Sequence, residues 1–299
     1  MDTPTRLSGL WLPLITPFRD GALDEASLIR LVRHYAAQPI DGLIVAATTG
    51  EALTLDDDEV ERIVAITGAE TRIPILLGLS GSNTGKLLKE LDRTRRWPIA
   101  GYLVACPYYV RPSQEGLYRH FAALAARTDR PLLIYNIPYR TGVNMTNETM
   151  LRLAALANIA GVKDCCADPA QTFDLLRARP ATFSVLTGED GQLHTALSQG
   201  ADGGILASAH VETARFAEVL RLMRAGDNAA ALRLWRDLID LVRLLFAEPN
   251  PGPLKHWLWR QGLIASPELR LPMTEVSAGM AARLDAELAR RSAISVEAA

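Results

Sequence analysis

The sequence has little cysteine, no long apolar run and no apolar N-terminus. Cys106, Cys165 and Cys166 are an odd number of cysteines without CxxC spacing, which argues against a disulfide framework and fits a reducing compartment. No stretch approaches the ~20 apolar residues that a membrane-spanning helix needs, and residues 1–6 lack the apolar core of a secretory signal. We therefore expect a cytoplasmic protein with no membrane partner.

Basic clusters and histidine clusters are missing as well. Lys and Arg number 32 against 34 Asp and Glu, a net charge of −2, without the cationic block that phosphate backbones require. The histidines show neither an HExxH pair nor comparable metal-ligand spacing. They are His34, His120, His194, His210 and His256. The sequence predicts no nucleic-acid partner and gives no evidence for a metal.

Eight short apolar runs recur along the chain. They are continuous rather than alternating, which is typical of strands buried on both faces, as in a parallel sheet covered by helices. The runs cover residues 10–15, 42–46, 74–79, 100–105, 132–135, 159–162, 183–186 and 203–207. Helix signals separate them, with N-terminal caps expected at Asp24, Thr54, Ser113 and Thr146.

The eight strand-helix units predict an α/β fold, a closed (β/α)8 TIM barrel with a C-terminal helical extension. Their spacing, without a long linker, favours the closed barrel over a doubly wound sheet. We expect a catalytic barrel over residues 1–225 and a C-terminal helical domain over residues 226–299, with helices at 227–246, 251–261 and 274–291. The first of these helices has an apolar stripe that should pack on the barrel or on a partner subunit.

Lys163 is the only cation in the run Ile159 to Lys163 and stands at its end. A desolvated lysine loses its proton, and the neutral amine can attack a ketone to form a Schiff base. A solvated lysine just past a strand end is the alternative. Cys165 and Cys166 follow, and we interpret them as small core residues, with a redox role as the lesser alternative.

Three further strand ends carry polar or aromatic side chains. They are residues 47–51, 106–109 and 135–142. Each has a structural explanation when taken alone: a turn at Thr48-Thr49-Gly50, packing by tyrosines, or a surface ion pair at Arg140. The carboxyl ends of barrel strands meet at one rim, however, so these residues are expected to share a cavity with Lys163.

The motifs, in this order, resemble the dihydrodipicolinate synthases, which belong to the superfamily of pyruvate-dependent class I aldolases and lyases. The resemblance runs nearly from end to end. It rests on residues 14–18, Thr48-Thr49-Gly50-Glu51, residues 107–116, residues 135–142, Gly161-Val162-Lys163-Asp164, residues 248–251 and residues 269–273.

The resemblance implies that Lys163 forms a covalent Schiff base with pyruvate and that no other cofactor is needed. The enamine would attack L-aspartate 4-semialdehyde, giving a cyclic product for lysine and diaminopimelate synthesis. Tyr135 would shuttle protons above Lys163, and Thr49 and Tyr109 would complete a hydroxyl relay. In the family the tyrosine matching Tyr109 comes from a neighbouring subunit, which implies a homo-oligomer, either a dimer or a tetramer.

Binding residues follow from the same resemblance. Thr48 and the backbone around Thr49 would hold the pyruvate carboxylate. Arg140 would bind the carboxylate of the semialdehyde, which suits its planar fork of donors. Gly188 and Ile205 match positions whose backbone faces the lysine.

Two regions depart from the family pattern. Tyr139 stands where the synthases usually carry a small residue, which changes the surroundings of the presumed carboxylate-binding arginine. In lysine-inhibited members the inhibitor pocket uses histidine, asparagine and glutamate, and this chain keeps little of that set. The matching positions are Asp57, Val60, Ser82 and Lys86. We therefore expect weak or absent inhibition by lysine.

Three other functions are compatible with parts of the pattern. A related pyruvate-dependent Schiff-base aldolase or lyase, acting on a sugar acid or hydroxy-oxo acid, would keep Lys163 and Tyr135 but typically lack Arg140. A non-catalytic barrel would have lost a member of the set that also includes Thr49 and Tyr109, and all four are present. A metal-dependent barrel enzyme would need a ligand cluster.

Overall fold

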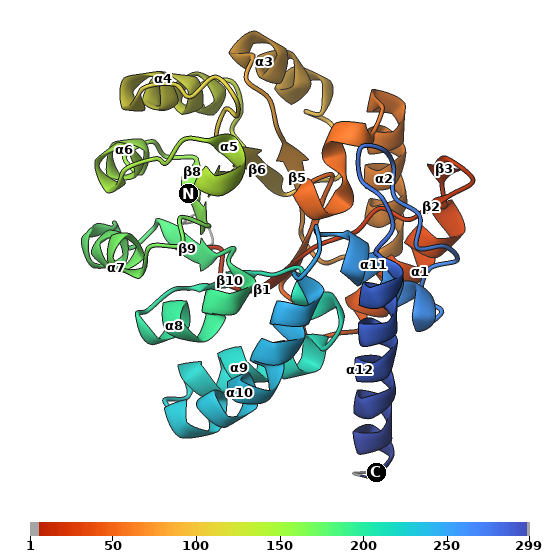
Figure 1. Ribbon diagram of the computed structural model, residues 1–299. Coiled ribbons are helices and arrows are strands. Elements are labelled where there is room, and N and C mark those ends of the chain that lie inside the picture. Colours follow the sequence, from red (N-terminus) through yellow and green to blue (C-terminus); the bar gives the residue numbers. More distant parts are fainter. Residues whose placement is uncertain (1–5, 298–299) are drawn as a thin grey trace.

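Eight parallel strands close into a barrel in the computed structural model, which describes residues 6–297 (Figure 1). Going round the barrel, β1 pairs with β10 and with β4, and the remaining strands pair with their neighbours in the chain. The predicted (β/α)8 barrel is confirmed, and every predicted run contains a strand. The strands are β1 (Gly9–Pro13), β4 (Gly42–Val45), β5 (Ile75–Leu79), β6 (Gly101–Ala105), β7 (Leu132–Asn136), β8 (Ile159–Asp164), β9 (Ser184–Thr187) and β10 (Gly203–Ile205).

Helices surround the barrel and bury the outward-facing side of each strand (Figure 1). They are α1 (Glu25–Ala36), α2 (Asp57–Glu70), α3 (Thr84–Arg93), α4 (Gln114–Ala125), α6 (Asn147–Leu153), α7 (Pro169–Ala178), α8 (Leu193–Ser198) and α9 (Thr213–Arg224). A second apolar cluster fills the barrel interior and includes Trp11, Leu133, Tyr135 and Ile205. Because side chains alternate along a strand, Lys163 on β8 shares this inner side with Gly161.

The helix caps were largely predictable. Asp24, Ser113 and Thr146 each accept a backbone hydrogen bond at the start of α1, α4 and α6, as expected. The cap expected at Thr54 is wrong, because α2 begins after Asp56. Asp56 has an extended backbone and forms a capping box with Glu59, which satisfies two backbone donors at once.

Several short elements lie at the strand ends, and of these only the turn over Thr48-Thr49-Gly50 was expected from the sequence. These are the hairpin β2 (Phe18–Arg19) and β3 (Ala22–Leu23), the 3-10 turns η1 (Thr48–Gly50), η2 (Ala52–Thr54), η3 (Asp190–Gln192) and η4 (Ser208–His210), and the short helix α5 (Pro138–Thr141). They are too short to show a periodic pattern. Several of them nevertheless carry the candidate functional residues.

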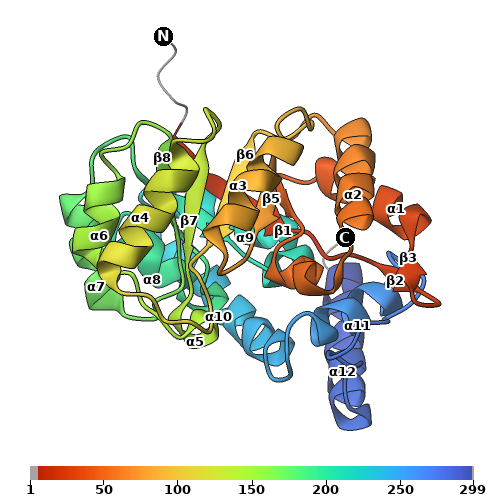
Figure 2. The same ribbon diagram turned by 90° about the horizontal axis from the view of Figure 1, so that it is seen from above.

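Three helices follow the barrel: α10 (Asn228–Leu245), α11 (Gly252–Arg260) and α12 (Ala278–Glu297). The apolar stripe of α10, which includes Trp235 and Leu238, is buried, and α10 packs against α8 and α9. Figure 2 shows α11 and α12 on the same side of the barrel as α5, which follows the carboxyl end of β7. Among the described residues, none of the helices combines the length and apolar character needed to cross a bilayer.

Candidate active site

Lys163 lies inside the barrel near the end of β8, beside Tyr135 of β7 and Leu186 of β9. Its side chain is buried, and its Nζ atom lies 4.4 Å from the centre of the Tyr135 ring. Burial lowers the pKa of Lys163, because an ammonium group loses its hydration there, while the nearby carboxylates of Asp190 and Glu189 oppose this effect. The alternative of a solvated surface lysine is wrong.

Tyr135 is buried opposite Lys163. Burial raises the pKa of Tyr135 well above its ordinary value, and a hydrogen bond with Thr48 partly opposes this rise. The phenol therefore stays protonated at neutral pH. A neutral phenol in contact with a second hydroxyl group can both donate and accept a proton, which is what a proton shuttle requires.

Gly188, directly after β9, lies against the lysine, and Ile205 of β10 lies on the inner side of the barrel. A Cβ atom on Gly188 would lie only 2.4 Å from Cε of Lys163 and from Sγ of Cys165, so a larger side chain would displace the lysine. Ile205 is buried at the end of β10 in the same inner cluster as Tyr135. Gly188 therefore lies against the lysine, whereas the facing position implied for the backbone of Ile205 stays a prediction.

Two carboxylates beside the lysine were missed. Asp190 is buried, and it accepts hydrogen bonds from the backbone nitrogen and Oγ of Ser208 at 2.7 and 2.5 Å. Burial raises the pKa of Asp190 to about 6, against the opposing effects of Ser208 and Lys163. Burial also raises the pKa of Glu189. Both residues lie two and three positions after the end of β9, so inspecting that strand end in the sequence would have found them.

A cavity of about 310 Å³ opens above Tyr135. Thr48, Tyr108 and Arg140 line it from the barrel, and Asn250 and Met273 line it from the C-terminal segment. Arg140 is on α5, and its guanidinium lies 5.8 Å from the ring centre of Tyr139. A cavity of this size, with one cation and several hydroxyl groups, suits a small anionic ligand.

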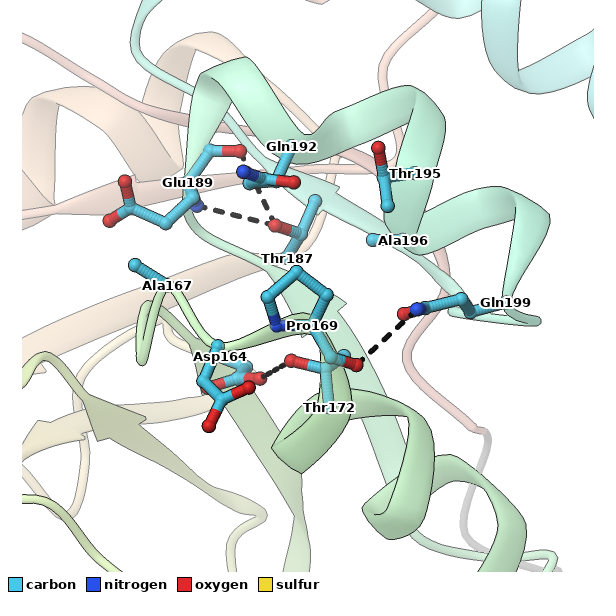
Figure 3. A pocket seen from close by; sticks show the side chains of 11 residues that line it. Asp164, Ala167, Pro169, Thr172, Thr187, Glu189, Gln192, Thr195, Ala196 and Gln199 are labelled. Atoms are coloured by element: carbon cyan, nitrogen blue, oxygen red, sulfur yellow. Dashed lines mark hydrogen bonds between the residues drawn. The ribbon is translucent and has the colours of Figure 1, made fainter.

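A much smaller pocket, of about 20 Å³, lies between the ends of β8 and β9 and has room for about one water (Figure 3). Asp164, the residue after the lysine, accepts hydrogen bonds there from Oγ1 of Thr172 at 2.6 Å and from the nitrogen of Cys166 at 3.1 Å. Burial raises the pKa of the Cys166 thiol to about 11, and that of Cys165 is raised as well. Protonated thiols fit the structural interpretation of both cysteines.

The two threonines of η1 make different contacts. Thr48 is the hydroxyl partner of Tyr135. Thr49 is buried, and its Oγ1 accepts a hydrogen bond of 3.1 Å from Nδ2 of Asn250. The family resemblance implied Thr49 as the relay hydroxyl, and the hydrogen bond that opposes the raised pKa of Tyr135 comes from Thr48, one residue earlier.

Tyr109 lies apart from the other candidates. It is 90% exposed, its backbone has a positive φ of 71°, and its nitrogen donates to the carbonyl of Thr141. It lines a separate surface groove with Asp57, Ser82 and Lys86. Within this single chain, its phenol does not complete the cavity above Tyr135.

The closed barrel places the chain among the α/β-barrel proteins, whose active sites lie at the carboxyl ends of the strands, and the buried Lys163 stands at such an end. Residues 6–291 match the model of the dihydrodipicolinate synthetase family, and the chain belongs to that family. Over the part of the chain that the structure describes, no three His, Cys, Asp or Glu side chains are grouped so that they could hold a metal ion.

Individual relatives agree with this assignment. The chain is 44% identical to 4-hydroxy-tetrahydrodipicolinate synthase 2 of Clostridium acetobutylicum, over 94% of this chain and 99% of the relative. The dihydrodipicolinate synthase of Aquifex aeolicus superposes with a TM-score of 0.92 at 32% identity, covering 96% of this chain and 98% of that one. The chloride-inhibited Acinetobacter baumannii enzyme, solved with pyruvate, has a TM-score of 0.89 at 33% identity, with 94% and 97% covered.

Proposed function

We propose that the protein is a 4-hydroxy-tetrahydrodipicolinate synthase, a lyase that condenses pyruvate with L-aspartate 4-semialdehyde for lysine and diaminopimelate biosynthesis in the cytoplasm. The observation that carries the proposal is the buried Lys163, with its lowered pKa, facing the protonated Tyr135. Family membership and the close relatives that bear this name support the choice of reaction.

The first half of the reaction uses Lys163 as nucleophile. Its neutral amine attacks the ketone carbon of pyruvate, and loss of water leaves a protonated Schiff base. Tyr135 transfers protons during the addition and the loss of water. The iminium then withdraws electrons from the methyl group, which loses a proton to give an enamine.

The second half joins the two substrates. The enamine carbon attacks the aldehyde carbon of the semialdehyde, and the aldehyde oxygen takes up a proton. The amino group of the semialdehyde then attacks the iminium carbon, which closes the ring and expels the Lys163 amine. The exposed Arg140 at the cavity mouth suits the carboxylate of the second substrate.

We assign the hydroxyl next to Tyr135 in the proton relay to Thr48, because Thr48 is its hydrogen-bond partner. Thr49, together with the backbone of η1, is then available for the pyruvate carboxylate. The exposed Tyr109 would reach the relay of a neighbouring subunit, so we propose a homo-oligomer, a dimer or tetramer.

The aldehyde is tested by comparing substrates. Turnover of pyruvate with aspartate semialdehyde, followed through a coupled reductase, should exceed the cleavage of sugar acids and hydroxy-oxo acids. The rival, a pyruvate-dependent aldolase of the same superfamily, has one observation in its favour. Tyr139 places a bulky phenol ring 5.8 Å from the guanidinium of Arg140, the residue proposed to bind the carboxylate of the second substrate. A pyruvate adduct without semialdehyde turnover would select this rival.

A further inference from the structure

We propose that Asn250, in the segment between α10 and α11, is a positioning residue that turns the Thr49 hydroxyl toward the carboxylate of pyruvate. The inference rests on the proposed function, because it takes pyruvate as the ligand held by η1. It gives the C-terminal segment a direct part in binding the first substrate.

The contact between Asn250 and Thr49 is buried and specific. Thr49 is 4% exposed and Asn250 is 9% exposed, and Nδ2 of Asn250 donates to Oγ1 of Thr49 at 3.1 Å. Asn250 also lines the 310 Å³ cavity together with Thr48 and Arg140. The amide therefore reaches the turn from outside the barrel, at the edge of the substrate cavity.

The direction of this hydrogen bond fixes the role of the hydroxyl. An amide nitrogen only donates, so Oγ1 of Thr49 must act as the acceptor toward Asn250, and its single proton is left for another partner. An ionised carboxylate only accepts, and a hydrogen bond to it is stronger than one to a neutral group. Asn250 thus makes Thr49 a donor, as holding a carboxylate requires.

The segment that carries Asn250 is anchored to the same turn. Lys255 on α11 forms a fully buried ion pair with Glu51, which directly follows η1 and has a left-handed backbone with a φ of 55°. Nζ of Lys255 also donates to the carbonyl of Glu268 at 2.8 Å, and the nitrogen of Arg270 donates to Glu51 at 3.1 Å. These contacts fix the distance between the amide and Thr49.

The test replaces the donating amide with an accepting group of nearly the same size, in Asn250→Asp. The introduced carboxylate would take the Thr49 proton and add a negative charge beside the pyruvate carboxylate. The readout is deuterium exchange into the methyl group of pyruvate, followed by NMR over a range of pyruvate concentrations, which needs no aldehyde. We expect KM for pyruvate to rise at least about tenfold, with a smaller change in kcat. This pattern is expected when a substitution weakens the binding of substrate and transition state equally.

The pH dependence of KM for pyruvate distinguishes a positioning role of Asn250 from a purely structural one. A protonated carboxyl can donate again, so the ratio of the KM values of Asn250→Asp and wild type should fall as the pH is lowered. The matched control is Asn158→Asp. The amide of Asn158 donates to the carbonyls of Ala125 and Thr128 just before β8, at the opposite end of that strand from Lys163. This control should lower Tm and leave KM for pyruvate unchanged.

A double variant tests whether Asn250 acts through Thr49. In the background of Thr49→Val, Asn250→Asp should add little to the rise in KM, because the hydroxyl it orients is already gone. If Asn250→Asp does not fold, Asn250→Ser takes its place. Its smaller side chain no longer reaches Thr49 as a fixed donor, and it should raise KM severalfold.

Three results would overturn the inference: a KM for Asn250→Asp no higher than that of Asn158→Asp, a KM ratio independent of pH, or full additivity in the double variant. Wild-type protein that exchanges no deuterium would contradict the proposed function together with this inference. Exchange without semialdehyde turnover would contradict only the assignment of the aldehyde.

Discussion

At the scale of single residues, the burial of Lys163 has two effects. It makes the amine more reactive at neutral pH, and it lowers the stability of the folded protein. The pKa of Lys163 is lowered in the folded state. Lys163 therefore binds its proton less tightly in the folded protein than in the unfolded chain. Each unit of lowering is worth about 1.4 kcal/mol. Between the lowered pKa of the folded state and the ordinary pKa of 10.5 in the unfolded chain, the unfolded state binds more protons, so stability should rise with pH within this window.

Lys163→Met should therefore stabilise the fold while abolishing activity. The methionine has a similar shape and needs no hydration. The free energy of unfolding should be higher than that of the wild type near neutral pH, and this gain should shrink as the pH approaches 10.5, the ordinary pKa of lysine. Denaturant unfolding at several pH values measures it. A destabilised variant, or a gain that grows with pH, would contradict the desolvation of Lys163.

Tyr135→Phe separates proton transfer from packing. The ring is kept in the inner cluster, so the fold should be unchanged, but the phenol facing Lys163 and its hydrogen bond to Thr48 are lost. We expect kcat to fall by about 10²- to 10⁴-fold, the usual contribution of a positioned acid or base. Steady-state kinetics and a thermal melt measure both properties. If Tyr135→Phe had the same kcat as the wild type, Tyr135 would not transfer protons in the reaction.

At the scale of elements, the turn η1 and the helix α11 are joined by the buried pair of Glu51 and Lys255. Burial lowers the pKa of Lys255 to about 8, while the adjacent Glu51 opposes this shift. Lys255 is also stacked 4.3 Å from the ring centre of Phe18. The turn that holds Thr48 and Thr49 therefore depends on a helix outside the barrel.

Lys255→Met should destabilise the protein strongly, because it leaves the Glu51 carboxylate buried without its partner. The expected loss is about 3–5 kcal/mol, as for other broken buried pairs. The double variant that also carries Glu51→Gln should recover much of this loss, since the uncompensated charge is gone. Chemical denaturation gives the free energy of unfolding of the wild type, the two single variants and the double variant, which together form a double-mutant cycle. Strictly additive losses would contradict the coupling.

The elements show what the sequence could predict and why. Continuous apolar runs mark all eight barrel strands, and their ends drew attention to Lys163 on β8, to Tyr135 on β7 and to Arg140, which lies on α5 just after β7. Thr54 was mistaken for the cap of α2, because the capping box of Asp56 and Glu59 depends on a local backbone angle. The role of Asn250 and Lys255 could not be predicted, since it arises from how the C-terminal segment folds back over the barrel.

At the scale of the whole molecule, the exposed Tyr109 makes the assembly part of the mechanism. If its phenol serves a neighbouring subunit, Tyr109→Phe and Lys163→Ala should each lower the activity of the pure variant severely. Mixed oligomers of the two variants would then contain sites with both side chains intact. Activity should therefore return after dissociation and joint reassembly. Mass spectrometry would show that the mixed oligomers contain both chains. If such oligomers were no more active than the pure variants, a site shared between subunits would be contradicted.

Inhibition by lysine depends on a groove at the surface of the whole molecule. The groove beside Tyr109 includes the side chains of Lys86 and Asp57. An ammonium group at Lys86 would repel the cationic ends of lysine, in line with the weak or absent inhibition that the sequence led us to expect. Millimolar lysine should leave the rate of an active sample unchanged at saturating substrates. Cooperative suppression by lysine would show that this groove still binds the inhibitor.

Trapping the covalent intermediate tests the central claim, that Lys163 is the nucleophile for pyruvate, most directly. The protein is incubated with pyruvate and borohydride, digested and analysed by mass spectrometry, with Lys163→Ala and a sample lacking pyruvate as controls. We predict a single adduct on the peptide that contains Lys163, heavier by the mass of pyruvic acid less one oxygen atom. An unmodified Lys163, or an adduct that persists in Lys163→Ala, would contradict the account.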